Sequence, residues 1–134
     1  MTSISHIAIA VSDINCAINT FTEILGCRPS MIKEVIDHKV KIAFFPGKDE
    51  LQPCIELVSP IGEDSNIQAF LDKRGEGLHH IALRVSNIEQ KMSELKEEGF
   101  KMIDEKPRIG ARGNKIAFVH PLSCSGVLIE LVEE

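Results

Sequence analysis

The sequence predicts an α+β protein made of two tandem βαβββ modules, and an internal repeat is the main reason. Three segments recur at one offset of 74 residues: His6-Ile-Ala as His80-Ile-Ala, Lys41-Ile-Ala-Phe as Lys115-Ile-Ala-Phe, and Ile55-Glu-Leu-Val as Ile129-Glu-Leu-Val. Chance similarity among apolar strands would not keep one register across three segments, so we infer an ancestral duplication. A second observation agrees, because strand-like and helix-like periodicities follow the same order in both halves.

The first module is expected at about residues 4–58. Alternation predicts a strand at 4–11, and Asp13 or Ser12 can cap the helix that follows. That helix is predicted from apolar residues at helical spacing, which are Ile14, Ala17, Ile18, Phe21 and Leu25, and Gly26 ends it. Strands at 31–36, 39–46 and 53–58 complete the module.

A linker at 59–77 joins the modules, and Asp64-Ser65 can cap a short helix within it. The second module, at about 78–132, repeats the order of the first. It is expected to contain a strand at 78–85, a helix from about Ile88 to Glu98 that Gly99 ends, and strands near 100–103, 114–119 and 126–132. Residues 107–113 are expected to form a loop. The whole chain, 1–134, is therefore interpreted as a single domain of two modules.

The bulk composition excludes several classes of protein. A formal net charge of −5 argues against nucleic-acid binding, which depends on a basic surface. No apolar run approaches the roughly 20 residues of a membrane span, and strand-like sequence from Ile4 leaves no room for a signal peptide. The four cysteines include no close pair, which predicts reduced thiols and a cytoplasmic protein. Cys16 and Cys54 are expected to be buried.

The repeated segments carry residues that bind metals. Glu56 and Glu130 each interrupt an apolar strand, where burial of an unpaired carboxylate is costly. A single strand histidine is more often a hydrogen-bonded core residue, but the repetition of His6 as His80 favours a site with four ligands. Two imidazoles and two carboxylates suit Mn, Fe, Co, Ni or Zn, and would leave two octahedral positions for water or substrate.

Two longer stretches, Gly75-Glu-Gly-Leu-His-His and Arg108-Ile-Gly-Ala, resemble the methylmalonyl-CoA epimerase family. The His-Ile-Ala and Ile-Glu-Leu segments resemble the wider vicinal-oxygen-chelate superfamily, which includes glyoxalases, bleomycin resistance proteins and dioxygenases. The similarity covers nearly the whole chain. It implies a curved mixed sheet around a metal cleft, a divalent metal ion (Co, Mn, Ni or Zn), an acyl-CoA substrate and a homodimer.

The resemblance also implies roles for individual residues. It places the metal ligands on His6, Glu56, His80 and Glu130, although some family members carry Gln in place of Glu56. The register selects His80 over His79, because His80 is the repeat partner of His6. The implied reaction is epimerisation of methylmalonyl-CoA, in which a proton leaves and returns to the carbon between thioester and carboxylate. Glu130 is one implied proton-transfer group, and the repeat makes Glu56 the second.

Substrate contacts are harder to assign, because two positions depart from the family's pattern. Lys41 stands where some epimerases carry a glutamate; it is either a contact for the substrate carboxylate or a solvated strand residue. Leu122 replaces a lysine that follows His-Pro in the family. Basic residues gather at 101–115, where Arg108 and Arg112 are the candidates for coenzyme A phosphates. A solvated basic loop is the alternative interpretation of that segment.

Three other functions stay open on the sequence. Glyoxalase I (lactoylglutathione lyase) would use the same ligands, but its usual arginine after the first strand is replaced here by Val11-Ser12-Asp13. A metal-free small-molecule binding or resistance protein of the same fold usually loses the ligands, which this chain keeps. A ring-cleaving dioxygenase would use two histidines and one glutamate around iron, which leaves a fourth ligand unexplained.

Overall fold

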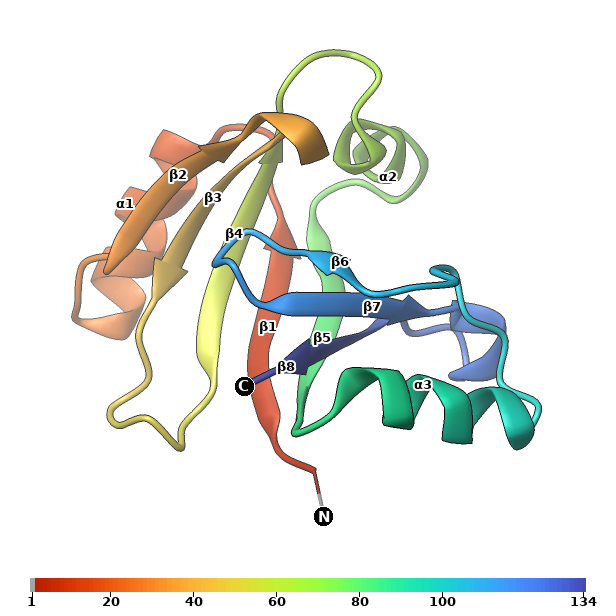
Figure 1. Ribbon diagram of the computed structural model, residues 1–134. Coiled ribbons are helices and arrows are strands. Elements are labelled where there is room, and N and C mark those ends of the chain that lie inside the picture. The colour runs from red at the N-terminus through yellow and green to blue at the C-terminus, as the bar shows by residue number, and fades with distance from the viewer. Residues whose placement is uncertain (1) are drawn as a thin grey trace. The chain divides into compact units, whose positions relative to one another are not determined.

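The computed structural model describes residues 2–134, in which the βαβββ order occurs twice (Figure 1). The strands are β1 (Ile4–Ala10), β2 (Met31–Val35), β3 (Val40–Phe45), β4 (Cys54–Pro60), β5 (Gly77–Val85), β6 (Arg108–Ile109), β7 (Lys115–Val119) and β8 (Ile129–Glu133). The helices are α1 (Ile14–Leu25), α2 (Asn66–Arg74) and α3 (Ile88–Glu97), with 3₁₀ turns at Ile36–His38 and Pro121–Ser123. The strands belong to one mixed sheet in the order β2-β3-β4-β1-β5-β8-β7-β6, which confirms the predicted α+β class.

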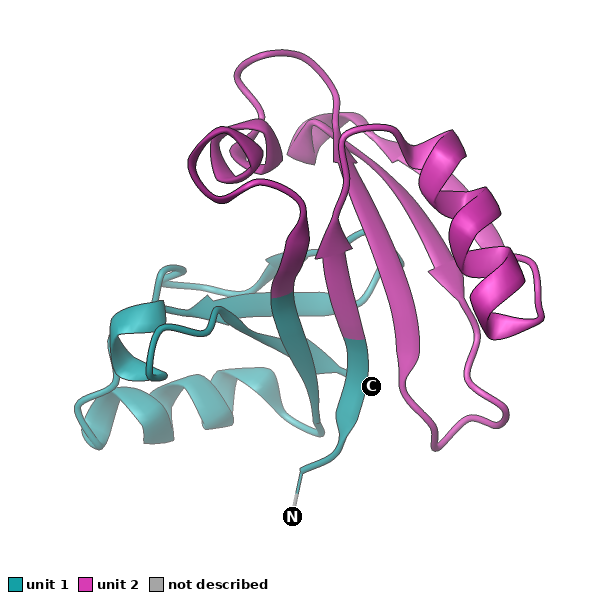
Figure 2. Ribbon diagram, turned by 180° about the vertical axis from the view of Figure 1, so that it is seen from behind, with its two compact units in different colours: residues 1–6, 80–134 teal, residues 7–79 magenta. Residues whose placement is uncertain are grey.

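The chain separates into two compact units (Figure 2). One contains residues 7–79, and the other contains residues 80–134 with the N-terminal residues up to His6. In the unit of residues 7–79, β3 pairs antiparallel with both β2 and β4, and α1 packs on β3 and β4. Its buried core consists of Val11, Ile14, Ala43, Phe45 and Leu57.

The other unit, which contains residues 80–134, buries an equivalent core. Strand β8 pairs in parallel with β5 and antiparallel with β7, and α3 packs on β7 and β8 (Figure 1). The buried core consists of Ile88, Met92, Ala117, Val119 and Leu131. Apart from Met92, each of these residues lies one repeat length after a core residue of the first unit. The internal repeat of the sequence is therefore a repeat of packing positions.

Strand register repeats in the same way. Phe44 is opposite Glu56 in the β3–β4 pair, and Phe118 is opposite Glu130 in the β7–β8 pair. Both phenylalanine–glutamate pairs are thus separated by the offset found in the sequence. Because a slip by one residue would turn every side chain to the other face of its strand, the shared register gives Glu56 and Glu130 equivalent places in their units.

Helix caps repeat as well. The Asp13 Oδ1 atom accepts a hydrogen bond from the backbone N–H of Cys16, and Asn87 Oδ1 accepts one from Gln90, each at 3.1 Å. Asp13, and not Ser12, is therefore the N-cap of α1. At the other end, Gly26 adopts the left-handed conformation (φ 70°) that was expected to end the helix. None of the described helices combines the length and the apolar character that crossing a membrane requires.

The sequence prediction was wrong for the segment between α3 and β7. Instead of a strand at 100–103, only Met102 makes an isolated bridge, to Val119. The absence of the strand follows from the Asp104 carboxylate, which accepts a hydrogen bond from the backbone N–H of Phe118 at 2.7 Å. A strand paired with β7 at this point would need the same N–H for its own hydrogen bond. The segment expected to be a loop contains the short strand β6 instead. The last strand begins at Ile129, later than the predicted 126.

The expectation of buried cysteines was wrong for Cys16, which is exposed on α1. Cys16 lies outside the apolar stripe of the helix. The stripe packs against the core and consists of Ile14, Ala17, Ile18 and Phe21. Cys54 lies in β4 as predicted and is half-buried, as are Cys27 and Cys124. All four cysteines are free in this structure.

Candidate metal and catalytic site

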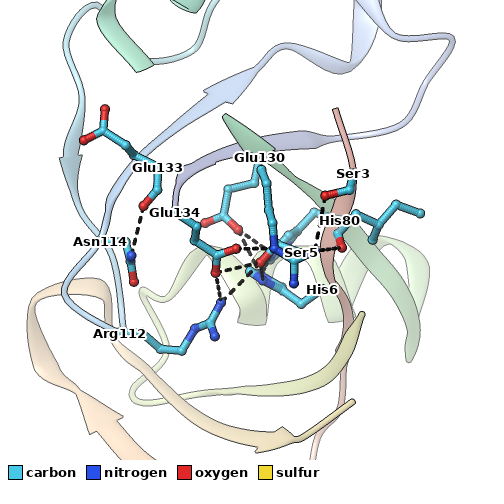
Figure 3. A network of polar contacts seen from close by, with 11 residues as sticks. Ser3, Ser5, His6, His80, Arg112, Asn114, Glu130, Glu133 and Glu134 are labelled. Carbon is cyan, nitrogen blue, oxygen red and sulfur yellow. Dashed lines mark hydrogen bonds and ion pairs between the residues drawn. The ribbon is translucent and has the colours of Figure 1, made fainter. Parts of the chain in front are cut away.

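Three buried side chains converge at one point of the unit that contains residues 80–134 (Figure 3). His6 Nε2 lies 2.9 Å from Glu130 Oε2 and 3.4 Å from His80 Nε2, and the distance from His80 Nε2 to Glu130 Oε2 is also 3.4 Å. All three residues are buried, between 4% and 7% exposed. The predicted ligands His6, His80 and Glu130 therefore form one cluster.

Strand geometry brings these side chains together. His6 lies in β1, His80 in β5 and Glu130 in β8, and the parallel pairing of β5 with β8 sets Ala82 opposite Glu130. Ala82 is fully buried, so the side chain opposite the carboxylate in this strand pair is a single methyl group. The Phe118 ring meets the His80 ring edge to face, with centroids 5.5 Å apart, and so limits rotation of that imidazole.

The donor atoms have the spacing of a metal site. A point equidistant from the three atoms lies about 1.9 Å from each, close to the roughly 2.0–2.2 Å that zinc keeps to histidine nitrogen and carboxylate oxygen. Among the described residues, the buried Glu130 Oε2 atom accepts no aligned hydrogen bond, despite the two ring nitrogens beside it. An orphaned buried oxygen facing two imidazoles fits a cation bound between them.

The electrostatics of the cluster favour the anionic form of Glu130. Burial acts to raise the pKa of this carboxyl, but the polar and electrostatic interactions with the His6 and His80 rings lower it to about 2. A metal cation bound at the same point would act in the same direction. Glu130 is therefore present as a carboxylate, which is the form that binds a metal or accepts a proton.

The fourth predicted ligand, Glu56, lies in the other compact unit. It is buried in β4, only 6% exposed, and is opposite Phe44 in the strand register. Its position in the strand register is the counterpart of that of Glu130. Its membership of the metal site and its catalytic role stay predictions.

The two adjacent histidines of β5 have different surroundings, as the repeat register predicted. His80 is buried in the three-residue cluster. His79 is only partly buried, and its ring packs edge to face against Phe70 with centroids 4.8 Å apart. The alternation of side chains along a strand accounts for the difference, because neighbours point to opposite faces.

The residues predicted to contact substrate have partners of their own. Arg108 Nε lies 3.2 Å from Asp104 Oδ1, and its guanidinium group lies over the Phe118 ring, 5.4 Å from the centroid. Arg112 Nη2 lies 2.9 Å from Glu134 Oε1. Lys41 lies half-buried in β3, opposite Glu34 on one side and Ser59 on the other. Substrate binding by Arg108, Arg112 and Lys41 stays a prediction.

Two polar residues near His6 were missed by the sequence analysis. Ser5 is almost completely buried, 1% exposed, and its Oγ atom lies 3.2 Å from His6 Nδ1. The same hydroxyl donates a hydrogen bond to Glu134 Oε1 at 3.1 Å (Figure 3). A serine directly before a predicted metal ligand was the available signal for Ser5, whereas nothing local in the sequence marked Glu134.

Comparison with known proteins identifies relatives over nearly the whole chain. Residues 5–118 match the family described as the Glyoxalase/Bleomycin resistance protein/Dioxygenase superfamily. An uncharacterized protein of Bacillus subtilis is 38% identical over 133 residues, which cover 99% of this chain and 93% of the relative. The mitochondrial methylmalonyl-CoA epimerase of Homo sapiens is 37% identical over 130 residues, which cover 96% of this chain and 72% of the human protein.

Solved structures give the same result. The crystal structure of methylmalonyl-CoA epimerase from Mycobacterium tuberculosis superposes with a TM-score of 0.90 at 34% identity, covering 98% of this chain and 87% of that one. The resemblance predicted from the sequence motifs is thereby confirmed, and these relatives support the assignment of the chain as an epimerase enzyme. The chain belongs to the Glyoxalase/Bleomycin resistance protein/Dioxygenase superfamily.

Proposed function

We propose that this protein is a metal-dependent methylmalonyl-CoA epimerase, which interconverts the 2R and 2S forms of its substrate. The observation that carries the proposal is the convergence of His6, His80 and Glu130, all buried, at metal-ligand distances in a chain related to methylmalonyl-CoA epimerases. Glyoxalase I would use a similar ligand set, and the resemblance of the 75–80 segment to epimerases favours the epimerase over it.

The proposed metal ligands are His6, His80, Glu130 and Glu56. A divalent ion bound there would supply a Lewis acid that stabilises the negative charge developing on the thioester oxygen, worth several kcal/mol. His6 and His80 would bind the ion as neutral imidazoles through Nε2, the atoms that face Glu130. Four protein ligands would leave positions at the ion for substrate oxygens. Cobalt is the proposed ion, with Mn, Ni and Zn as alternatives.

The chain's own carboxylates are proposed to move the proton. Epimerisation needs one group that removes the C2 proton from one face of the substrate and another that delivers a proton to the opposite face. Glu130 is ionised and can accept a proton. Glu56, at the equivalent register position of its own unit, is proposed as the second group, so that the roles exchange with the direction of reaction.

The remaining proposals concern the substrate's coenzyme A portion and the setting of the protein. Phosphate contacts are proposed for Arg108 and Arg112, in the basic segment 101–115, and a carboxylate contact for Lys41. Four free thiols are consistent with the proposed reducing, cytoplasmic location. A homodimer of single-domain chains, each with two modules, is proposed from the family resemblance.

Deuterium uptake tests the function. Methylmalonyl-CoA in D2O is followed by NMR with chelator-stripped protein, before and after addition of cobalt, and cobalt without protein corrects for spontaneous exchange at C2. We expect uptake at C2 that requires both protein and metal. Absence of uptake with folded, metal-loaded protein would refute the epimerase proposal, and the glutathione hemithioacetal would then be tested as the substrate of glyoxalase I.

A further inference from the structure

A chain of polar contacts leads from His6 away from the metal-facing side of its ring (Figure 3). His6 Nδ1 contacts Ser5 Oγ at 3.2 Å, and Ser5 Oγ contacts Glu134 Oε1 at 3.1 Å. Two arginines flank the end of this chain. Arg112 Nη2 donates to Glu134 Oε1 at 2.9 Å and to Ser5 Oγ at 3.3 Å, and Arg84 Nε donates to Glu134 Oε2 at 2.7 Å.

The number of protons available determines the direction of each hydrogen bond around Ser5 Oγ. The Ser5 hydroxyl has one proton to donate and two lone pairs that accept. The Arg112 guanidinium can only donate, and the Glu134 carboxylate, held between two guanidinium groups, can only accept. The single Ser5 proton therefore goes to Glu134. The remaining contact, between Ser5 Oγ and His6 Nδ1, forms a hydrogen bond only if His6 Nδ1 carries the proton.

We propose that Ser5 and Glu134 are positioning residues that hold His6 as its Nδ1–H tautomer, with the Nε2 lone pair directed at the metal site. The inference rests on the proposed metal site, and it concerns which ring nitrogen is free to bind. Metal-binding histidines commonly donate their second ring N–H to a carboxylate, which fixes both tautomer and ring orientation. Here the serine hydroxyl relays that interaction to the Glu134 carboxylate.

The alternative tautomer would take His6 away from the metal site. With the proton on Nε2, His6 would point an N–H toward Glu130 Oε2, which is 2.9 Å away but not aligned for a hydrogen bond. The proton would occupy the nitrogen lone pair that the metal needs. The contacts of Ser5 with its two partners oppose this arrangement, because an Nδ1 atom without a proton would face a serine oxygen whose proton is already committed.

Histidine tautomers in the metal-free protein provide the first test. Long-range ¹H–¹⁵N correlation spectra of histidine-labelled protein distinguish a protonated from an unprotonated ring nitrogen at neutral pH. We expect His6 to be the Nδ1–H form in the parent protein. Ser5→Ala removes the acceptor, and Glu134→Ala frees the Ser5 proton to donate to Nδ1, so both variants should shift His6 toward the Nε2–H form.

Metal affinity provides the second test. Cobalt binding, measured by competition with a chelating dye, should weaken by roughly 10–100-fold in Ser5→Ala and Glu134→Ala, as for other residues that orient a metal ligand. Ser3→Ala is the matched control, because Ser3 accepts from Arg84 at 3.3 Å but belongs to the exposed end of the network. It should keep the parent tautomer and affinity, and Ser5→Thr, which retains the hydroxyl, should restore both.

The outcomes separate this proposal from loss of fold and from failure of the proposed function. Circular dichroism checks each variant, and the Glu134 side chain is only partly buried, 20% exposed, so Glu134→Ala remains a test if Ser5→Ala fails to fold. Parent tautomer and parent cobalt affinity in Glu134→Ala would overturn the proposal. Neither measurement uses substrate, so both results hold whether or not the protein epimerises methylmalonyl-CoA.

Discussion

His6 Nε2 lies 2.9 Å from Glu130 Oε2, yet among the described residues that buried oxygen accepts no aligned hydrogen bond. A buried carboxylate oxygen beside two imidazole nitrogens, with no aligned donor, is placed to bind a cation. A cation there would neutralise the carboxylate and satisfy these atoms. The relationship between these two residues is the main structural reason to expect metal binding.

Glu130→Gln should keep the fold and lose most of the metal affinity. Glutamine has the shape of glutamate but lacks the negative charge, so cobalt binding should weaken by at least roughly 10–100-fold in isothermal titration calorimetry. The rate of deuterium exchange into methylmalonyl-CoA should fall strongly, whereas the free energy of unfolding should change little. An exchange rate equal to that of the parent protein would remove Glu130 from the mechanism.

The neighbouring histidines of β5 offer a matched pair of variants. His80→Ala removes a cluster residue, so cobalt affinity should fall by more than about 100-fold, beyond the loss typical of residues that only orient a ligand. His79→Ala removes a partly buried ring that packs on Phe70, so it should leave cobalt affinity unchanged. Both are measured by the dye competition assay. Equal losses in the two variants would contradict the assignment of His80 as the ligand.

Repeated helix caps give a prediction about stability. Asp13→Ala and Asn87→Ala each remove the side-chain acceptor for one backbone N–H at the start of a helix. Each should lower the free energy of unfolding by about 1 kcal/mol in urea denaturation, with no change in cobalt affinity. Ser12→Ala is the control, because Ser12 is not the cap, and its free energy of unfolding should match the parent value.

Local patterns were sufficient to predict much of the fold. The repeat at 74 residues predicted the βαβββ order, the choice of His80 over His79 and the equivalence of Glu56 with Glu130. These features depend on periodicity, which a single sequence displays directly. Gly26 was predicted as a helix end for the same reason, since the left-handed cap conformation favours glycine.

Features that depend on distant side chains were not predictable. The strand expected at 100–103 is absent because the Asp104 carboxylate takes the Phe118 backbone N–H, a contact with no local signature. The contact between Ser5 and Glu134 joins residues from the two ends of the sequence. The direction of that hydrogen bond depends on all the donors and acceptors around the Ser5 hydroxyl, which come from distant parts of the chain.

Cysteine reactivity provides the last prediction. Cys16 is exposed on α1, whereas Cys124 is half-buried, and burial raises the pKa of the Cys124 thiol above its ordinary value. The thiolate is the reactive form, so at every pH below its pKa the raised value leaves Cys124 with a smaller reactive fraction than an unperturbed thiol.

Iodoacetamide at pH 8, followed by peptide mass spectrometry, should modify Cys16 several times faster than Cys124. The difference should shrink as the pH rises and disappear in urea, where both side chains are solvated. Equal rates in the native protein at pH 8 would contradict the burial of Cys124, and Cys16→Ser, which should leave the Cys124 rate unchanged, identifies the faster site.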